Sequence, residues 1–197
     1  MKALVVNNDS DTWQALCDTV RQAGFQIATV HHSDIHKVDM SEFDLVVLSG
    51  GWWNDDVSEL LSNYGEELRV IRESKVPILG GCIGMQLMHV ALEQAVPLMD
   101  QPQLGGRGIK LTERGRKLFD LPAVIIVHKN HTRAVVEADP SFEVLASSRS
   151  GVEIMQHRTR PLLGVQFHPE VGSVERRYSL MKALTDHLLT AAADARR

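Results

Sequence analysis

The sequence predicts an α/β fold: a mostly parallel central sheet with helices on both faces, plus a small antiparallel β section in the second half. Three observations support this prediction. Short apolar runs alternate with amphipathic helical patterns in the first half of the chain. These runs are apolar at consecutive positions, which is typical of parallel strands buried on both faces. After residue 106, short β-like runs dominate the pattern.

The elements of the first half follow from apolar periodicity and from the residues that end helices. We expect strands at 2–7, 25–30, 44–49 and 76–79, and helices at 11–23 and 57–73. Ligands of parallel sheets bind at the carboxyl ends of the strands. Gly50 and Gly51 follow the third of these strands, and Cys82 closely follows the fourth. These residues are therefore expected to share one crevice.

The second half is read as a loop, a series of short strands and a closing helix. The loop is expected at 101–106, the strands at 108–111, 123–127, 142–147, 152–156 and 162–167, and the helix at 174–193. The spacing of the short runs is typical of antiparallel hairpins. No internal repeat or linker is visible, so residues 1–197 are expected to form a single domain.

The composition argues against several classes of function. The 197 residues are 44% hydrophobic, enough for a sizeable core, and the net charge is −4 with both signs scattered along the chain. No basic stripe is present, which argues against nucleic acid as a partner. No run approaches the ~18 apolar residues of a membrane span, and no signal-peptide pattern is visible. Two cysteines make no disulfide framework, so a cytoplasmic protein is expected.

Cys82 lies where the apolar strand at 76–79 passes into a helical pattern, with glycines on both sides. Such a strand-to-helix corner is typical of a nucleophile elbow, in which a tight turn presents a reactive side chain. The N-terminus of the following helix favours the thiolate. These residues alone are equally compatible with a buried structural cysteine. Cys17 lies within a helical pattern and is expected to be buried.

A second candidate motif is His168-Pro169-Glu170, where the last expected strand ends. The residue before a proline favours extended geometry, and positions i and i+2 of an extended chain project to the same side. Glu170 can therefore orient the imidazole of His168. A cysteine nucleophile needs a base, and the base needs an orienting group. Together with Cys82, His168 and Glu170 supply a nucleophile, a base and an orienting group.

With both motifs in view, the sequence resembles the class I (triad-type) glutamine amidotransferases. Residues 82–86 match the Cys-x-Gly-x-Gln part of the family's nucleophile motif, and 164–170 match its second signature at every position. The separation of Cys82 and His168 (168 − 82 = 86 residues) also fits. Residues 47–51 resemble the family's first glycine motif, so the resemblance covers nearly the whole chain. It implies a flavodoxin-like fold and hydrolysis of L-glutamine.

The resemblance also implies roles for individual residues. Cys82 would attack the side-chain amide of glutamine, His168 would transfer protons, and Glu170 would orient His168. The backbone N–H groups of Gly51 and Ile83 would form the oxyanion hole. The remaining implied substrate-binding residues are Gly50, Gln86, Asn130 and His131.

Two features depart from the family pattern. Asn130 stands where a serine usually precedes the histidine of a segment expected just before a strand. Trp52 and Trp53 follow the glycine pair, where the family usually has a proline that fixes the oxyanion-hole amide. The tryptophans could form a lid or a docking patch; we favour packing on the neighbouring helix.

No metal site and no cofactor are expected. His31, His32 and His36 are expected in a loop, and their spacing is not tied to carboxylates or cysteines. A phosphate-binding Gly-x-x-x-x-Gly-Lys-Ser/Thr loop is absent from the sequence, so the resemblance implies that ATP chemistry lies on another polypeptide.

The resemblance implies that the partner is an ATP-using synthetase chain, within a hetero-oligomer. Residues 105–111 and 130–135 look most similar to the separate glutaminase subunit of guanosine monophosphate (GMP) synthetase, an enzyme of purine biosynthesis. Residues 7–10 resemble the first loop of anthranilate or aminodeoxychorismate synthase glutaminase subunits. Two other classes stay open: a stand-alone γ-glutamyl amide hydrolase and a catalytically silent binding subunit.

Overall fold

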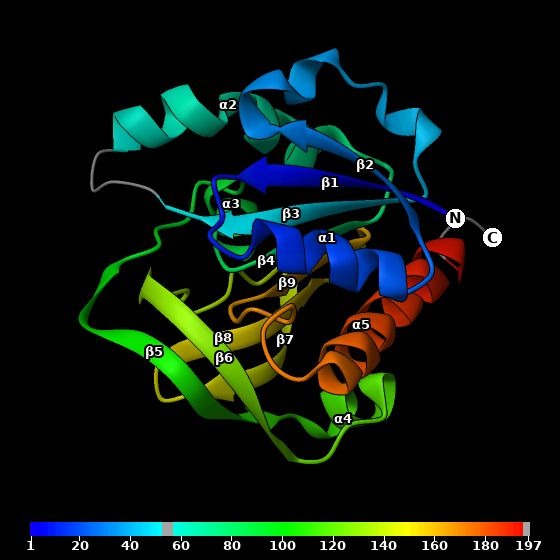
Figure 1. Cartoon of the computed structure of the whole chain (residues 1–197). Helices are drawn as coiled ribbons and strands as arrows, with labels where there is room; N and C mark the ends of the chain where they lie inside the picture. Colours follow the sequence, from blue (N-terminus) through cyan, green and yellow to red (C-terminus); the bar gives the residue numbers. More distant parts are fainter. Residues whose placement is uncertain (53–56, 195–197) are drawn as a thin grey trace.

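The computed structural model describes residues 1–52 and 57–194 (Figure 1). The strands are β1 Lys2–Asn8, β2 Gln26–His31, β3 Leu45–Gly51, β4 Ile78–Gly81, β5 Leu98–Leu111, β6 Val124–Arg133, β7 Phe142–Ser148, β8 Gly151–His157 and β9 Leu162–Val165. The α-helices are α1 Trp13–Gln22, α2 Val57–Glu73, α3 Ile83–Val90, α4 Glu113–Phe119 and α5 Val174–Asp194. Two short 3₁₀ helices are η1 His32–Lys37 and η2 Met40–Glu42. No helix in this part of the chain is long and apolar enough to cross a membrane.

The described strands form one sheet in the order β2-β1-β3-β4-β9-β8-β7-β5-β6. Neighbours from β2 to β9 pair in parallel. Neighbours from β9 to β6 pair in antiparallel fashion. This confirms the predicted fold class, including the change to antiparallel pairing in the second half.

Two hydrophobic cores, one on each face of the sheet, explain why the parallel strands are apolar at every position. Successive residues of a strand point to opposite faces. Leu45 and Val47 of β3 belong to the core under α1 and α5, whereas Val46 and Leu48 belong to the core under α2 and α3. Figure 1 shows α1 and α5 in front of the strands.

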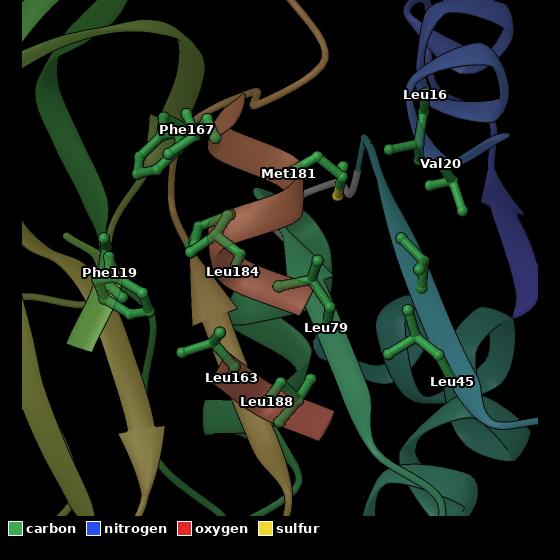
Figure 2. Close-up of a cluster of buried hydrophobic side chains, with 14 of the residues drawn as sticks. Leu16, Val20, Leu45, Leu79, Phe119, Leu163, Phe167, Met181, Leu184 and Leu188 are labelled. Carbon is green, nitrogen blue, oxygen red and sulfur yellow. The ribbon is translucent and has the colours of Figure 1, made fainter. Parts of the chain in front are cut away.

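Figure 2 shows the core on the α1 and α5 face. Leu16 of α1 and Leu184 of α5 lie in one cluster with Leu79 of β4 and Leu163 of β9. Because β4 and β9 lie at the centre of the sheet, this packing fixes the strand ends that carry the two sequence motifs.

Three expectations about secondary structure need correction. The loop expected at 101–106 lies within β5, where Leu104 pairs with Asn130 and Gly106 with His128. Pro102 lies in the irregular register between Leu98 and Gln103, whereas Gly105 and Gly106 pair regularly with Lys129 and His128. The sequence analysis also missed the short helix α4. Of the histidines expected in a loop, His31 ends β2, whereas His32 and His36 lie in η1.

Candidate active site

Cys82 occupies the corner between β4 and α3, as predicted. Its φ of 51° and ψ of −107° place a non-glycine residue at positive φ. Such a conformation costs of order 1–3 kcal/mol and persists only where the surroundings impose it. The backbone N–H of Cys82 donates to the carbonyl of Val165 at 2.8 Å, which extends the β4–β9 pairing into the turn. The Cys82 residue is only 4% exposed.

His168 and Glu170 lie beside Cys82 because β9, which they follow, is paired with β4. His168 Nδ1 and Glu170 Oε1 are 2.8 Å apart, and both residues are buried. The two side chains project to the same side of the chain, as predicted. Nε2 of His168 is buried and has no hydrogen-bond partner within the described residues. This leaves the Nε2 atom available to exchange a proton.

The environment of His168 favours its protonated form. Burial alone lowers the pKa of the imidazole, but its interactions with Cys82 and Glu170 outweigh burial and raise the pKa to about 10.

Gly50 lies between the imidazole and the cysteine. A Cβ atom at this position would be 2.8 Å from Cε1 of His168 and 3.6 Å from Cβ of Cys82. Any side chain here would therefore push the imidazole away, so glycine keeps His168 close to Cys82. In this structure the thiol itself points to the backbone carbonyl of Asn130, at 3.8 Å.

The two predicted oxyanion-hole residues also lie at this edge of the sheet. Ile83 is the first residue of α3, so its N–H has no acceptor within the helix. Gly51 is the last residue of β3 and pairs with Asn8 of β1. A Cβ atom on Gly51 would collide with the carbonyl oxygen of Asn8. Close contact between strands therefore requires glycine here.

Trp52 follows Gly51 and is 56% exposed, so the packing that the sequence analysis favoured for this side chain is wrong. Its backbone carbonyl accepts a hydrogen bond of 3.0 Å from the hydroxyl of Tyr64 in α2. Trp53 lies outside the described residues.

Gln86 is buried and its side chain supports strand β6. Its Nε2 donates to the carbonyl of Arg133 at 3.0 Å and to Oε1 of Gln166 at 3.3 Å. The structure therefore places Gln86 under the end of β6, the strand that carries Asn130.

Asn130 and His131 lie inside β6, which corrects the expectation that they precede a strand. Neighbouring strand residues face opposite sides. Asn130 lines the crevice beside His168, whereas His131 is buried with Nδ1 2.8 Å from the carbonyl of Arg133. Burial lowers the pKa of His131 to about 4, so this imidazole is neutral at neutral pH.

The crevice at the carboxyl ends of the strands is narrow. Its volume of about 20 Å³ has room for roughly one water molecule. Its lining residues are Ser10, Asp11, Thr12, Gly51, Trp52, Asn130 and His168. This volume is smaller than a glutamine molecule, so a bound substrate would extend beyond these lining residues.

The sequence analysis did not identify Thr12, whose hydroxyl donates to Oε1 of Glu170 at 2.5 Å. The available signal was its place in the loop after the first expected strand, since the carboxyl ends of parallel strands share one edge. Only the strand order, with β1 next to β3, places this loop beside the crevice.

One group of side chains has the composition of a metal site: Asp9, His31 and His32 lie with their ligand atoms within 4.8 Å of one another. His31 Nδ1 accepts from the backbone N–H of Ser33 at 3.3 Å, so in the neutral ring Nε2 carries the proton and donates to Asp9 at 3.1 Å. The contacts thus fit a hydrogen-bonded cluster, and the lack of a metal site stays a prediction.

Known proteins share sequence and fold with this chain. The family model described as "Glutamine amidotransferase class-I" matches residues 4–187. The chain is 35% identical to the glutamine-hydrolyzing GMP synthase subunit of Saccharolobus solfataricus over 145 residues, which cover 73% of this chain and 76% of that protein. It is 32% identical to aminodeoxychorismate synthase of Streptomyces griseus over 191 residues, which cover 94% of this chain but 26% of that protein.

A solved structure shares the whole architecture. The crystal structure of a protein described as a GMP synthase subunit from Thermoplasma acidophilum has a TM-score of 0.83 and 26% sequence identity. The match covers 100% of this chain and 96% of that one. Family model, sequence relatives and architecture agree with the cysteine and histidine motifs: the chain belongs to the class I glutamine amidotransferases.

Proposed function

We propose that this chain hydrolyses L-glutamine to glutamate and ammonia, and that it delivers the ammonia to the separate ATP-using subunit of GMP synthase. The observation that carries the proposal is the 2.8 Å contact between His168 Nδ1 and Glu170 Oε1, next to Cys82 at its strained corner. Relatives named as glutamine-hydrolyzing GMP synthase subunits support the choice of pathway.

The first step is attack on the side-chain amide of glutamine. In the proposed first step Cys82 reacts as a thiolate and its proton is on His168, whose pKa is raised to about 10. The sulfur of Cys82 forms a bond to the amide carbon, and the C=O π electrons move to the oxygen. The N–H groups of Gly51 and Ile83 stabilise the resulting oxyanion.

Two proton transfers complete the reaction. As the oxyanion collapses, the C–N bond breaks and Nε2 of His168 gives its proton to the leaving nitrogen, which departs as ammonia. The neutral imidazole then takes a proton from water, which attacks the thioester. The C–S bond breaks, glutamate leaves, and the thiolate and imidazolium are restored.

Gly50, Gln86, Asn130 and His131 are proposed to bind the rest of the substrate, with the backbone of Asn130 and His131 at its carboxylate. The side-chain amide of Gln86 already holds the carbonyl of Arg133 and the side chain of Gln166. Gln86 therefore acts at least in part by supporting β6, which brings Asn130 to the crevice. The cytoplasmic location also stays a prediction.

Contact with the synthetase is proposed to widen the crevice and to set the oxyanion hole. The narrow crevice and the exposed Trp52 at its rim support this proposal. A bias of about 3 kcal/mol toward the productive state would raise activity roughly a hundredfold.

The test compares glutamine hydrolysis by the isolated chain with hydrolysis after addition of the GMP synthase synthetase subunit, ATP and the acceptor nucleotide. We expect slow hydrolysis alone and an increase in kcat larger than any decrease in KM. The Cys82→Ala variant should stay inactive in the mixture, while Cys17→Ala should behave like the unmodified chain. Full turnover alone, unchanged by the synthetase, would instead indicate a stand-alone γ-glutamyl amide hydrolase.

A second candidate is the glutaminase of aminodeoxychorismate or anthranilate synthase. The observation in its favour is the 32% identity to aminodeoxychorismate synthase over 94% of this chain. Mixing the chain with each of the three synthetase subunits separates the candidates, because only the true partner should raise kcat.

A further inference from the structure

We propose that Thr12 is a positioning residue for glutamine hydrolysis, which holds the carboxylate of Glu170 against His168. This inference rests on the proposed function and adds a residue to its machinery. The Thr12 hydroxyl donates to Oε1 of Glu170 at 2.5 Å, and the same oxygen lies 2.8 Å from Nδ1 of His168. The hydroxyl is itself 3.5 Å from Nδ1. One carboxylate oxygen therefore receives both donors.

The direction of the hydrogen bonds follows from the chemistry of the groups. An ionised carboxylate only accepts hydrogen bonds, so the single proton of the Thr12 hydroxyl goes to Glu170. Ser10 Oγ lies 3.0 Å from Thr12 Oγ1 and accepts the backbone N–H of Thr12 at 3.2 Å. The proton of Ser10 is then free to point at Thr12. The result is a short chain of donors from Ser10 through Thr12 to Glu170.

Thr12 occupies the N-cap position of α1, yet its side chain makes no capping hydrogen bond. Threonine is favoured at N-caps because its oxygen accepts from a backbone N–H of the first turn. Thr112 does this in the same chain: at the N-cap of α4 its hydroxyl accepts from the N–H of Gly115 at 3.0 Å. The Thr12 hydroxyl thus forms a hydrogen bond with Glu170 and does not cap its own helix.

The consequence for catalysis lies in the orientation of the imidazole. Glu170 holds the proton on Nδ1 of His168 and thereby turns Nε2 toward Cys82. It can do so only while its Oε1 stays in place. Glu170 follows β9, and Thr12 comes from a loop 158 residues away in sequence. The hydroxyl of Thr12 therefore anchors the carboxylate from a second, independent element.

The test uses Thr12→Val, which keeps the shape but removes the hydroxyl, and Thr12→Ser, which keeps the hydroxyl. Hydrogen bonds to charged groups are strong enough that Thr12→Val should lower kcat about ten- to a hundredfold. KM should change less than about twofold, because Thr12 acts on the base rather than on glutamine. Thr12→Ser should restore most of kcat.

Thr112→Val is the matched control. It removes a capping hydroxyl and should lower the melting temperature while leaving kcat unchanged. If Thr12→Val does not fold, Thr12→Ala replaces it, with Thr12→Ser again as the rescue.

A second readout separates this inference from the proposed function. The Nδ1 proton of His168, followed by NMR at low pH, should shift or broaden in Thr12→Val and stay in place in Thr12→Ser and Thr112→Val. This signal requires no glutamine hydrolysis, so it tests Thr12 even if the chain proves inactive. An unchanged signal together with an unchanged kcat in Thr12→Val would overturn the inference.

Discussion

Asn8 and Glu67 form a buried amide–carboxyl pair beneath the end of β3, with Asn8 Nδ2 donating to Glu67 Oε1 at 3.1 Å. Asn8 also donates to the carbonyl of Ser49 at 3.3 Å. The pair therefore links α2 to the strand that ends at Gly51. Burial raises the pKa of Glu67 to about 8, although the hydrogen bond from Asn8 opposes this shift.

We predict that Glu67 makes the protein less stable as pH rises. Its ordinary pKa is 4.5, so between 4.5 and about 8 the folded chain keeps a proton that the unfolded chain releases. This contribution to stability is complete below 4.5 and is lost as pH rises through about 8, with a slope of at most about 1.4 kcal/mol per pH unit. Urea denaturation of Glu67→Gln should show a weaker pH dependence, whereas the exposed neighbour variant Glu66→Gln should not.

A glutamine-like diazo-ketone should label Cys82 once per chain and leave Cys17 unmodified. Both cysteines are buried, at 4% and 3% exposure, so exposure alone does not distinguish them. Only Cys82 lies at the N-terminus of a helix beside His168, whereas burial raises the pKa of Cys17 and so disfavours its thiolate. Mass spectrometry of the labelled chain checks this expectation, and a label on Cys17 would contradict the assignment of the nucleophile.

Removing His168 should cost several orders of magnitude in kcat, and Glu170→Gln should cost less. In the proposed mechanism the imidazole transfers the protons, whereas the carboxylate only orients it. In Glu170→Gln the Thr12 hydroxyl can still hold the amide oxygen at that place. Steady-state glutaminase assays of His168→Ala and Glu170→Gln give the comparison. Near-full activity of His168→Ala would exclude the proposed triad.

The pH dependence of kcat/KM should reflect the raised pKa of His168. In the proposed mechanism the imidazolium is the active form of the resting enzyme, so activity should persist above neutral pH and decline as pH rises through about 10. A decline near 6.5, the ordinary pKa of histidine, would show that the interactions with Cys82 and Glu170 do not hold the proton.

Lys129 and Glu153 form an ion pair in which each side chain is 1% exposed, with Ser148 and Ser150 hydrogen-bonded to both. Removing one partner leaves an uncompensated buried charge, so Lys129→Met should lower the free energy of unfolding by about 3–5 kcal/mol. The double variant Lys129→Met/Glu153→Gln should recover part of this loss. Denaturant unfolding measures both, and Lys117→Met, in the exposed pair with Glu113, serves as the control.

The sequence by itself determined the parallel half of the fold and the position of the catalytic motifs. Strands such as β3 are apolar on both faces, and this pattern has one structural solution, burial between two layers of helices. Cys82 and the pair His168 and Glu170 could also be predicted from the sequence. A strand-to-helix corner and an i, i+2 relationship are local properties of the chain.

The tertiary structure alone decided which distant side chains meet. Thr12 forms a hydrogen bond with Glu170 because the strand order brings together the loops that carry these two residues. Nothing near Thr12 in the sequence specifies this contact. Lysine side chains are almost never fully buried unless they are paired. Lys129 is buried because it forms an ion pair with Glu153 of β8. Residues 101–106 form a strand because β6 supplies hydrogen bonds that override the local preference of proline and glycine for loops. In each case the deciding energy comes from a partner far along the chain.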